Sequence, residues 1–437
     1  MRFAVLTCFV LVSLASTYSV WQLTDIHVDP DYSIGADPAK GCHPPSPAKL
    51  PNGAEVCGRF GNTKAYSPVA LVESTLDFVN SLRGKDDVIV HTGDVSWYTQ
   101  TIGKADEMYG LKQLATVMHG AFPDTKVYPS TGNHDTWPCD ILGNPEGVSK
   151  WVIDDYMDAW QAILGKEELE QARYAGYYVA IPRPGVMLIS LNSVYFHQDN
   201  LLVTGHLDGG AHDKQLGWFE KSLAAAEQSN MTVWIISHVP FGFHEDLHDG
   251  EIQWGPQLTF LNTTQKYISL MQRYGDRVAL QVYGHQHSSG YRLVHQADGK
   301  NLAAIQFVAP SVTPHVGKYP SMWRYLMDDQ TNRLVGIEQW FVNLTLANQD
   351  GGRATWELQA RWPQDFGMAD LELDSWQKYT ERMRTDPAFL MKVRRLALAN
   401  YDDGKTCDDD CRQQLLCATL YTEPALYEPC IKVKPKA

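Results

Sequence analysis

The chain has 437 residues, 44% of them hydrophobic and 20% charged, which is the composition of a globular protein long enough for one large domain and an appendage. Its formal net charge of −14 argues against a nucleic-acid polymer as partner and against electrostatic docking on an anionic membrane, because both need a basic face. The 13 Trp and 21 Tyr provide aromatic side chains for a sizeable core.

Residues 1–19 are predicted to form a signal peptide. Arg2 supplies the positive start, residues 3–14 are apolar, and small residues follow. The apolar stretch is shorter than the roughly 20 residues of a membrane-spanning helix, so a signal peptide is favoured over an amino-terminal membrane anchor. We expect no transmembrane segment further along the chain, and we expect delivery to the extracellular space or the lysosome.

From residue 20 onward, apolar strands alternate with amphipathic helices, a pattern typical of sheets covered by helices. It predicts a catalytic domain over residues 20–345 and a helical subdomain over residues 346–437. Strands are expected at residues 20–23, 87–91, 126–128, 186–191, 232–236, 278–283, 291–294, 303–308, 323–327 and 334–341. Helices are expected at residues 68–82, 104–119, 213–228, 386–400 and 409–421, and the tail is expected to become helical from about residue 374.

Cysteines gather in two segments that need covalent staples, a Pro/Gly-rich loop at residues 40–60 and the last 31 residues. Cys139 is left over, and we interpret it as a bystander rather than a metal ligand. The expected disulfides pair Cys42 with Cys57, Cys407 with Cys411, and Cys417 with Cys430. Three sequons, at Asn230, Asn262 and Asn343, predict glycosylation and agree with export.

Five short polar clusters each follow a predicted strand. Because the carboxyl ends of strands converge at one edge of a sheet, we expect these clusters to lie together. Their carboxylate, amide and imidazole groups suit borderline divalent ions such as Zn, Mn or Fe. The predicted metal ligands are Asp25, His27, Asp94, Asn133, His238, His285 and His287. The other histidines lack such a context and are interpreted as surface or supporting residues.

These residue types favour a hydrolytic centre with two ions. Gly93 permits a sharp turn before Asp94, whose two carboxylate oxygens can bridge two ions. The charge of two ions outweighs that of Asp25 and Asp94, so the site would attract a phosphate. Two ions also lower the pKa of a water from 15.7 to about 7, which provides hydroxide for attack on phosphorus. We expect His134 to protonate the leaving oxygen as general acid, oriented by Asp135 or another carboxylate. Acid conditions should weaken metal loading unless the site is well buried, because ligand histidines must be neutral.

The same clusters resemble the calcineurin-like metallophosphoesterase superfamily. Finer details are similar to its acid-sphingomyelinase-like branch, and the similarity covers about residues 20–430. The motifs that carry this resemblance are Thr92-Gly-Asp94, Gly132-Asn-His-Asp135, Ala309-Pro-Ser-Val-Thr-Pro314, Asn343-Leu-Thr345 and the Cys-rich helical tail.

The resemblance implies an α/β fold, a four-layer αββα catalytic sandwich with a carboxy-terminal helical subdomain, and two zinc ions, with Mn or Fe as alternatives. One zinc would be held by Asp25, His27, Asp94 and His287. The other would be held by Asp94, Asn133, His238 and His285.

Two departures from the branch shape the functional hypothesis. The lipid-handling saposin-type domain of acid sphingomyelinase is not expected here, because the predicted leader runs almost directly into Asp25. Tyr98 takes the place of a substrate-contacting His four residues after Asp94, and it is a tentative substrate contact.

Our leading hypothesis is a secreted or lysosomal zinc-dependent phosphodiesterase that hydrolyses soluble phosphodiesters or nucleotide phosphates. The first alternative is a sphingomyelin phosphodiesterase that releases ceramide and phosphocholine, which would make a phospholipid the partner. The second alternative is a non-catalytic secreted binding glycoprotein, although the ligand set is complete.

Overall fold

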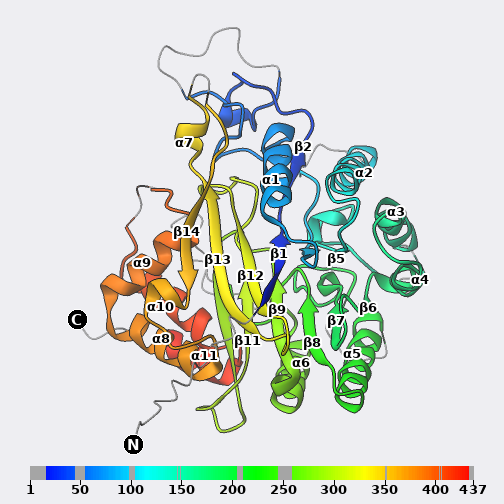
Figure 1. Ribbon diagram of the computed structural model, residues 1–437, viewed down its shortest axis with the longest axis vertical. Coiled ribbons are helices and arrows are strands. Elements are labelled where there is room, and N and C mark those ends of the chain that lie inside the picture. Colours follow the sequence, from blue (N-terminus) through cyan, green and yellow to red (C-terminus); the bar gives the residue numbers. More distant parts are fainter. Residues whose placement is uncertain are drawn as a thin grey trace, which may run out of the picture.

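Two six-stranded sheets packed face to face form the centre of the molecule (Figure 1). The computed structural model describes residues 16–44, 55–97, 104–144, 146–147, 149–203, 210–244, 258–349, 352–402, 404 and 406–432. Contacts between the sheets include the stacked rings of Tyr18 and Trp234, 6.1 Å apart, and a bond from Gln22 Nε2 to the Tyr283 carbonyl at 2.8 Å. The interior between the sheets is therefore a packed core.

Each of the two sheets combines parallel with antiparallel strands. The first sheet contains, in spatial order, β14 (Trp356–Trp362), β13 (Leu334–Val342), β12 (Ser321–Asp328), β1 (Thr17–Leu23), β4 (Val88–His91) and β5 (Val127–Pro129). The second contains β10 (Gly290–His295), β11 (Leu302–Val308), β9 (Val278–Tyr283), β8 (Thr232–Ile236), β7 (Val186–Ser190) and β6 (Tyr178–Ala180). Strands β1, β4 and β5 are parallel, as are β7, β8 and β9. A short ladder pairs β2 (Val28–Asp29) with β3 (Ser67–Pro68).

Helices cover the outer face of each sheet and complete the predicted four-layer sandwich. On the first sheet, Phe78 of α1 (Val69–Leu82) packs edge-on against Trp21 of β1 at 6.3 Å. On the second sheet, Tyr267 of α6 (Leu261–Tyr274) donates to Gln281 Oε1 of β9 at 2.7 Å. The remaining helices on this part of the chain are α2 (Lys104–Ala121), α3 (Lys150–Trp160), α4 (Lys166–Ala175) and α5 (Ala211–Gln228).

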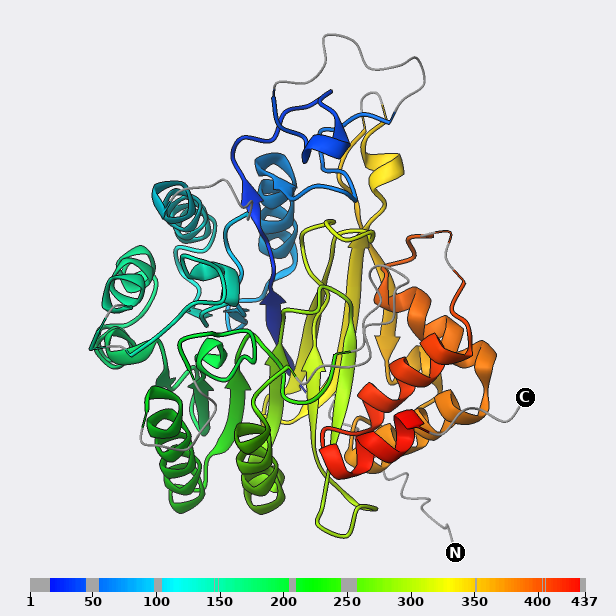
Figure 2. The ribbon, with the colours of Figure 1, turned by 180° about the vertical axis from the view of Figure 1, so that it is seen from behind.

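The carboxy-terminal helices close the end of the sandwich next to β14 and β10 (Figure 2). They are α8 (Leu373–Thr385), α9 (Pro387–Ala397), α10 (Asp409–Leu420) and α11 (Pro424–Lys432), and the short α7 (Leu344–Ala347) precedes them. Trp376 of α8 packs against Phe307 of the second sheet at 5.5 Å. The predicted cap of α9 is present, since Asp386 accepts a bond from the Phe389 amide at 3.1 Å.

Two element boundaries differ from those that the sequence suggests. Strand β14 lies within the segment assigned to the helical subdomain, yet it pairs antiparallel with β13 and completes the first sheet, so the helical part begins at Leu373. Strand β1 begins at Thr17, inside the predicted leader, and the Ser19 amide donates to Asp87 at 2.8 Å. Removal of all 19 residues would therefore shorten a buried central strand.

The three disulfides join the predicted cysteine pairs. Cys42–Cys57 closes the loop after β2, Cys407–Cys411 spans the start of α10, and Cys417–Cys430 ties α10 to α11. Cys139 takes part in no disulfide. Among the residues that the structure describes, no helix combines the length and apolar character needed to cross a membrane.

Candidate metal centre

The five polar clusters of the sequence meet at one edge of the sandwich. Asp25 and Asp94 follow β1 and β4 of the first sheet, and His238 and His285 follow β8 and β9 of the second sheet. Asn133 follows β5 and begins a short 3₁₀ turn. The carboxyl ends of the parallel strands thus bring side chains more than 250 positions apart in the sequence into one buried group.

The first group consists of Asp25, His27, Asp94 and His287. The Nε2 atoms of His27 and His287 are 3.2 Å apart, and His27 Nε2 is 3.5 Å from Asp94 Oδ2. His287 Nε2 is also 3.5 Å from Asp25 Oδ1. Donors about 2.0 Å from a tetrahedral ion are separated by about 3.3 Å. The four side chains therefore have the spacing of a metal cage.

The second group shares Asp94 with the first. His238 Nε2 is 3.2 Å from Asp94 Oδ2, the oxygen that also faces His27. Asn133 Oδ1 is 2.8 Å from His238 Nε2 and 2.9 Å from His285 Nδ1. A carboxylate oxygen common to both groups can bridge two ions. All seven predicted ligands are brought together, and their oxygen and imidazole donors fit two borderline divalent cations.

The backbone adopts unfavourable conformations to aim these side chains. Five of the seven residues have a positive φ, namely Asp25 (47°), His27 (46°), Asp94 (58°), His285 (73°) and His287 (57°). Such residues cost of order 1–3 kcal/mol each and persist where the surrounding structure over-determines them. Gly132 permits the close approach of two loops, because a Cβ there would lie 2.2 Å from Asp94 Oδ1. Conformational strain is therefore concentrated at the predicted ligands.

Backbone carbonyls orient two of the imidazoles. His27 Nδ1 is 2.8 Å from the Ser96 carbonyl, and His238 Nδ1 is 2.6 Å from the Thr92 carbonyl. A carbonyl can only accept, so each Nδ1 carries the proton and each Nε2 presents its lone pair to the cage. This arrangement is typical of metal-ligating histidines.

Asp135 has a role that the sequence did not suggest. Its carboxylate accepts bonds from the amides of Gly132 (2.7 Å), Val95 (2.8 Å) and Asp94 (3.1 Å). Asp135 thus joins the loop that carries Asp94 to the loop that carries Asn133. Sequence reasoning missed this role because main-chain donors leave no side-chain signal. Orientation of His134 by Asp135 or another carboxylate stays a prediction.

Replacing Asp135 with Asn should weaken metal binding by about 10–100-fold, as for other residues that support ligands. The amide can accept only part of the three N–H bonds, so the shared ligand Asp94 loses its fixed position. Calorimetric zinc titration of the variant and the parent measures the change. The exposed Asp158→Asn variant is the control, and equal affinities in all three proteins would contradict this role.

Burial places the protons of the metal-free site on its carboxyl groups. Desolvation raises the pKa of Asp25 to about 7 and that of Asp94 to about 6. It also holds the pKa of His27 and His285 well below the ordinary range, so these imidazoles are neutral. The acid sensitivity of metal loading is therefore expected to arise from Asp25 and Asp94 rather than from His27 and His285.

Metal binding should consequently release protons at acid pH. Below about pH 6 both Asp25 and Asp94 are protonated in the metal-free protein, so each bound pair of ions displaces up to two protons and affinity rises with pH. Above about pH 8 the release should vanish and affinity should level off. Titrations in buffers of different ionisation enthalpy count the protons. Proton release that is undiminished in Asp25→Asn would point to histidines instead.

His134 lies beside the cage without belonging to either group. Its ring centroid is 5.0 Å from that of His27, and its backbone amide donates to Asp94 Oδ1 at 2.8 Å. The side chain is half-buried. Its Nδ1 is 3.5 Å from Cys139 Sγ, which in turn donates to Asp140 Oδ2 at 3.0 Å. Cys139, which we interpreted as a bystander rather than a metal ligand, therefore contacts the predicted general acid His134.

His197 is one of the remaining histidines that the sequence assigns to surface or supporting positions, and it lies in a supporting position. It is buried, its Nδ1 is 3.1 Å from Asp140 Oδ1, and its ring meets that of His285 edge-on at 5.0 Å. The available signal was its position shortly after strand β7. Tyr98 lies outside the described residues, so its contact with substrate stays a prediction.

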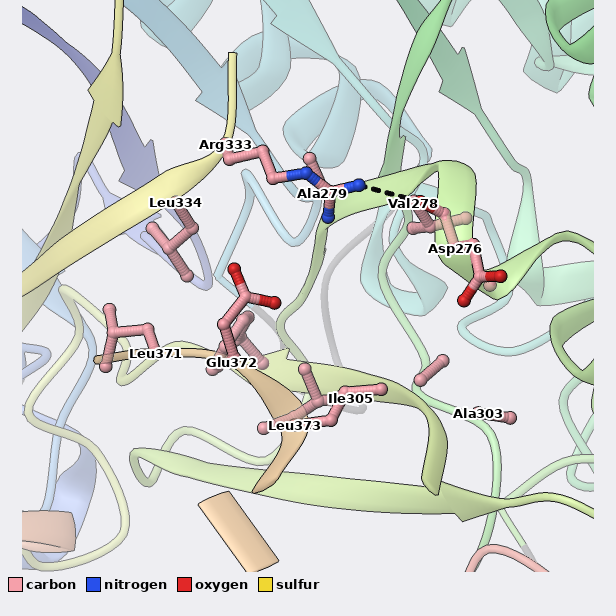
Figure 3. Close-up of a pocket in the computed structure, with 13 residues that line it drawn as sticks. Asp276, Val278, Ala279, Ala303, Ile305, Arg333, Leu334, Leu371, Glu372 and Leu373 are labelled. Carbon is pink, nitrogen blue, oxygen red and sulfur yellow. Dashed lines mark hydrogen bonds between the residues drawn. The ribbon is translucent and has the colours of Figure 1, made fainter. Parts of the chain in front are cut away.

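A separate cavity of ≈ 390 Å³ lies at the amino end of strand β9 in the second sheet (Figure 3). Val278 and Ala279, at the amino end of β9, line it together with Arg333 and Glu372. The predicted ligands follow the carboxyl end of the same strand. This cavity is therefore not part of the metal centre.

Comparison with known proteins agrees with this geometry. Residues 18–289, which contain all seven clustered side chains, match the calcineurin-like phosphoesterase family, and residues 301–437 match the acid sphingomyelin phosphodiesterase C-terminal region. The cyclic GMP-AMP phosphodiesterase of Rattus norvegicus is 27% identical over 94% of this chain and 91% of its own. The acid sphingomyelinase-like phosphodiesterase 3b of Homo sapiens is 26% identical, with 94% and 89% covered. Sphingomyelin phosphodiesterase A of Dictyostelium discoideum is 26% identical over 95% of this chain and 68% of its own. The chain thus belongs to the calcineurin-like phosphoesterase family, in its acid sphingomyelinase-like branch.

Proposed function

We propose that this phosphodiesterase uses two zinc ions to hydrolyse soluble phosphodiesters or nucleotide phosphates. One observation carries the proposal, namely two groups of buried donors that share the Oδ2 atom of Asp94. Four imidazoles and one amide among seven ligands favour zinc over harder ions, with Mn or Fe as the alternatives to test.

The residues of the chain suggest how the reaction proceeds. Bound ions would supply a hydroxide near neutral pH and would offset charge on the phosphoryl oxygens. Asp94 is the ligand that belongs to both donor groups, and Asp25 and the four histidines are their other ionisable members. His134, half-buried at the margin of the cage, donates a proton to the leaving oxygen. Because most of the ligand side chains are buried, their polar atoms are shielded from bulk water.

Sphingomyelin is the second candidate substrate. The match of residues 301–437 to the acid sphingomyelin phosphodiesterase C-terminal region is the observation that favours it. The net charge of −14 gives no support for electrostatic docking on an anionic lipid surface, so we rank soluble substrates first.

Metal removal and a substrate panel test this proposal. Purified protein should hydrolyse bis(p-nitrophenyl) phosphate and nucleotide esters, lose this activity on chelation, and regain it with zinc. Detergent-dispersed sphingomyelin at equal enzyme concentration separates the two candidate substrates. Full turnover by protein shown to be free of metal would refute the two-ion mechanism, and faster turnover of sphingomyelin would replace the soluble substrate.

Passage through the secretory route is part of the same proposal. Disulfides persist in oxidising compartments, which agrees with the three pairs described above. The predicted glycosylation sites Asn230 and Asn262 are exposed, whereas Asn343 is half-buried and caps α7 through Oδ1. Intact mass before and after glycosidase treatment of protein secreted by eukaryotic cells would count the glycans, and amino-terminal sequencing would locate the cleavage site.

A further inference from the structure

The first residues that the structure describes make contacts that a leader ending at residue 19 would remove. The Ser16 carbonyl accepts a bond from the Asp329 amide at 2.9 Å, and the Ser16 hydroxyl donates to Asp329 Oδ2 at 3.0 Å. Thr17 begins β1 and lies opposite Asp328 of β12 in the antiparallel ladder. Both Ser16 and Thr17 are exposed, so this end of β1 lies at the surface.

The next two residues, Tyr18 and Ser19, are buried between the sheets. The Tyr18 ring stacks on Trp234 of the second sheet, and its hydroxyl donates to Asn332 Oδ1 at 3.0 Å. The Arg183 guanidinium lies 3.5 Å from the centroid of the same ring. Buried aromatic side chains contribute strongly to core packing, so a chain without Tyr18 would lose a large part of the contact between the sheets.

The sequence around the start of β1 contains several bonds that suit a leader peptidase. A leader cleavage site has small residues one and three positions before the cut, with any residue between them. Within residues 13–19, cuts after Ala15, Thr17 and Ser19 meet this requirement, because the residue two positions before each of them is also small. The sequence alone therefore leaves three cuts open.

We propose that a leader peptidase hydrolyses the bond between Ala15 and Ser16, so that the mature protein begins with Ser16. This inference rests on the secretory route in the proposed function, and it moves the boundary of the leader from residue 19 to residue 15. Of the three cuts, this one alone leaves β1 whole. The other two would remove both bonds to Asp329, and the last of them would also remove the buried Tyr18.

The charge of the new amino terminus suits its surroundings. Hydrolysis adds one water across the peptide bond and leaves a carboxylate on Ala15 and an amino group on Ser16, whose ordinary pKa is about 7.7–8.0. The resulting cation would be next to the carboxylate that already accepts from the Ser16 hydroxyl. Because the Asp329 side chain is 45% exposed and also pairs with Arg183, this attraction contributes little to stability. The intact strand is the main reason for the choice of this bond.

Secretion of the full chain from eukaryotic cells tests this proposal. Amino-terminal sequencing and intact mass after glycosidase treatment should show Ser16 as the first residue of the parent in the medium. Ala15→Tyr should abolish cleavage at this bond, because it places a bulky side chain directly before the cut. Leu14→Tyr is the matched control. It changes the position that accepts any residue, so the protein should again begin with Ser16.

A deletion tests the structural part of the argument. Joining residue 15 directly to Val20 keeps a small residue before the cut but removes residues 16–19, and it should reduce the amount of secreted protein and lower the thermal midpoint of what is secreted. Parental yield and midpoint in this deletion would overturn the proposal, as would any other first residue in the secreted parent.

Failure of the proposed function is distinguishable from failure of this inference. Parent that stays in the cells with the uncut mass would refute the secretory route itself. Absent turnover of bis(p-nitrophenyl) phosphate by zinc-loaded secreted protein would refute the phosphodiesterase proposal, whatever its first residue.

Discussion

Replacing Asp94 with Asn should lower phosphodiester turnover by at least about 10³-fold, more than the loss of a single transition-state hydrogen-bond donor. The amide can keep an oxygen toward the His134 N–H, which now bonds Oδ1, and would then place an NH₂ group at the shared Oδ2 position. An NH₂ group cannot ligate either ion, so both groups of donors lose a member.

Folding is not expected to fail in this variant. Burial raises the pKa of Asp94 to about 6, so a neutral side chain is well tolerated at this position in the metal-free protein. The thermal midpoint without metal should be maintained, while the rise on adding zinc should shrink. Asp158→Asn, which removes an exposed carboxylate paired with Arg173, is the matched control. Parental turnover by Asp94→Asn would rule out a shared bridging ligand.

Replacing His134 with Gln should lower kcat, and the loss should be larger for substrates whose leaving group has a higher pKa. Loss of a general acid typically costs about 10²–10⁴-fold, and this loss should appear with alkyl and nucleoside leaving groups, which must be protonated. Turnover of p-nitrophenyl esters should fall much less, because p-nitrophenolate leaves without a proton. A plot of log kcat against leaving-group pKa should therefore become steeper in the variant.

Zinc content distinguishes this role from metal binding. His134 belongs to neither donor group, so His134→Gln should retain both ions, in contrast to His285→Gln. An equal loss with all leaving groups, or loss of zinc, would contradict the assignment of His134 as general acid.

The candidate site was predictable because its side chains directly follow segments with a strong strand pattern. Strands β8 and β9 are buried apolar runs, and the structure has them at the predicted residues, directly before His238 and His285. The Asp-x-His and His-x-His spacings then limited the candidate ligands. The way the ligands are aimed was not predictable, because positive φ values at Asp25 and His287 result from long-range packing.

The elements that sequence patterns missed give mixed or weak signals. Helix α6 has apolar residues at helical spacing in its second half, but its first half buries Thr263 and Thr264, polar residues that the pattern does not count. Helix α4 buries only Ala172 and Ala175. Strand β14 is an edge strand with exposed Glu357 and a register shift in its ladder, which weakens the alternation of period two.

Supporting residues were the least predictable part of the site. Asp135 binds backbone amides, and His197 contacts Asp140. No characteristic spacing in the sequence signals either contact.

Anomalous diffraction at the zinc edge, from crystals of zinc-loaded protein, tests the central claim most directly. Two peaks are predicted, one surrounded by Asp25, His27 and His287 and the other by Asn133, His238 and His285, each about 2.0–2.2 Å from the carboxylate of Asp94. A single peak, or two peaks that do not share Asp94, would contradict the account.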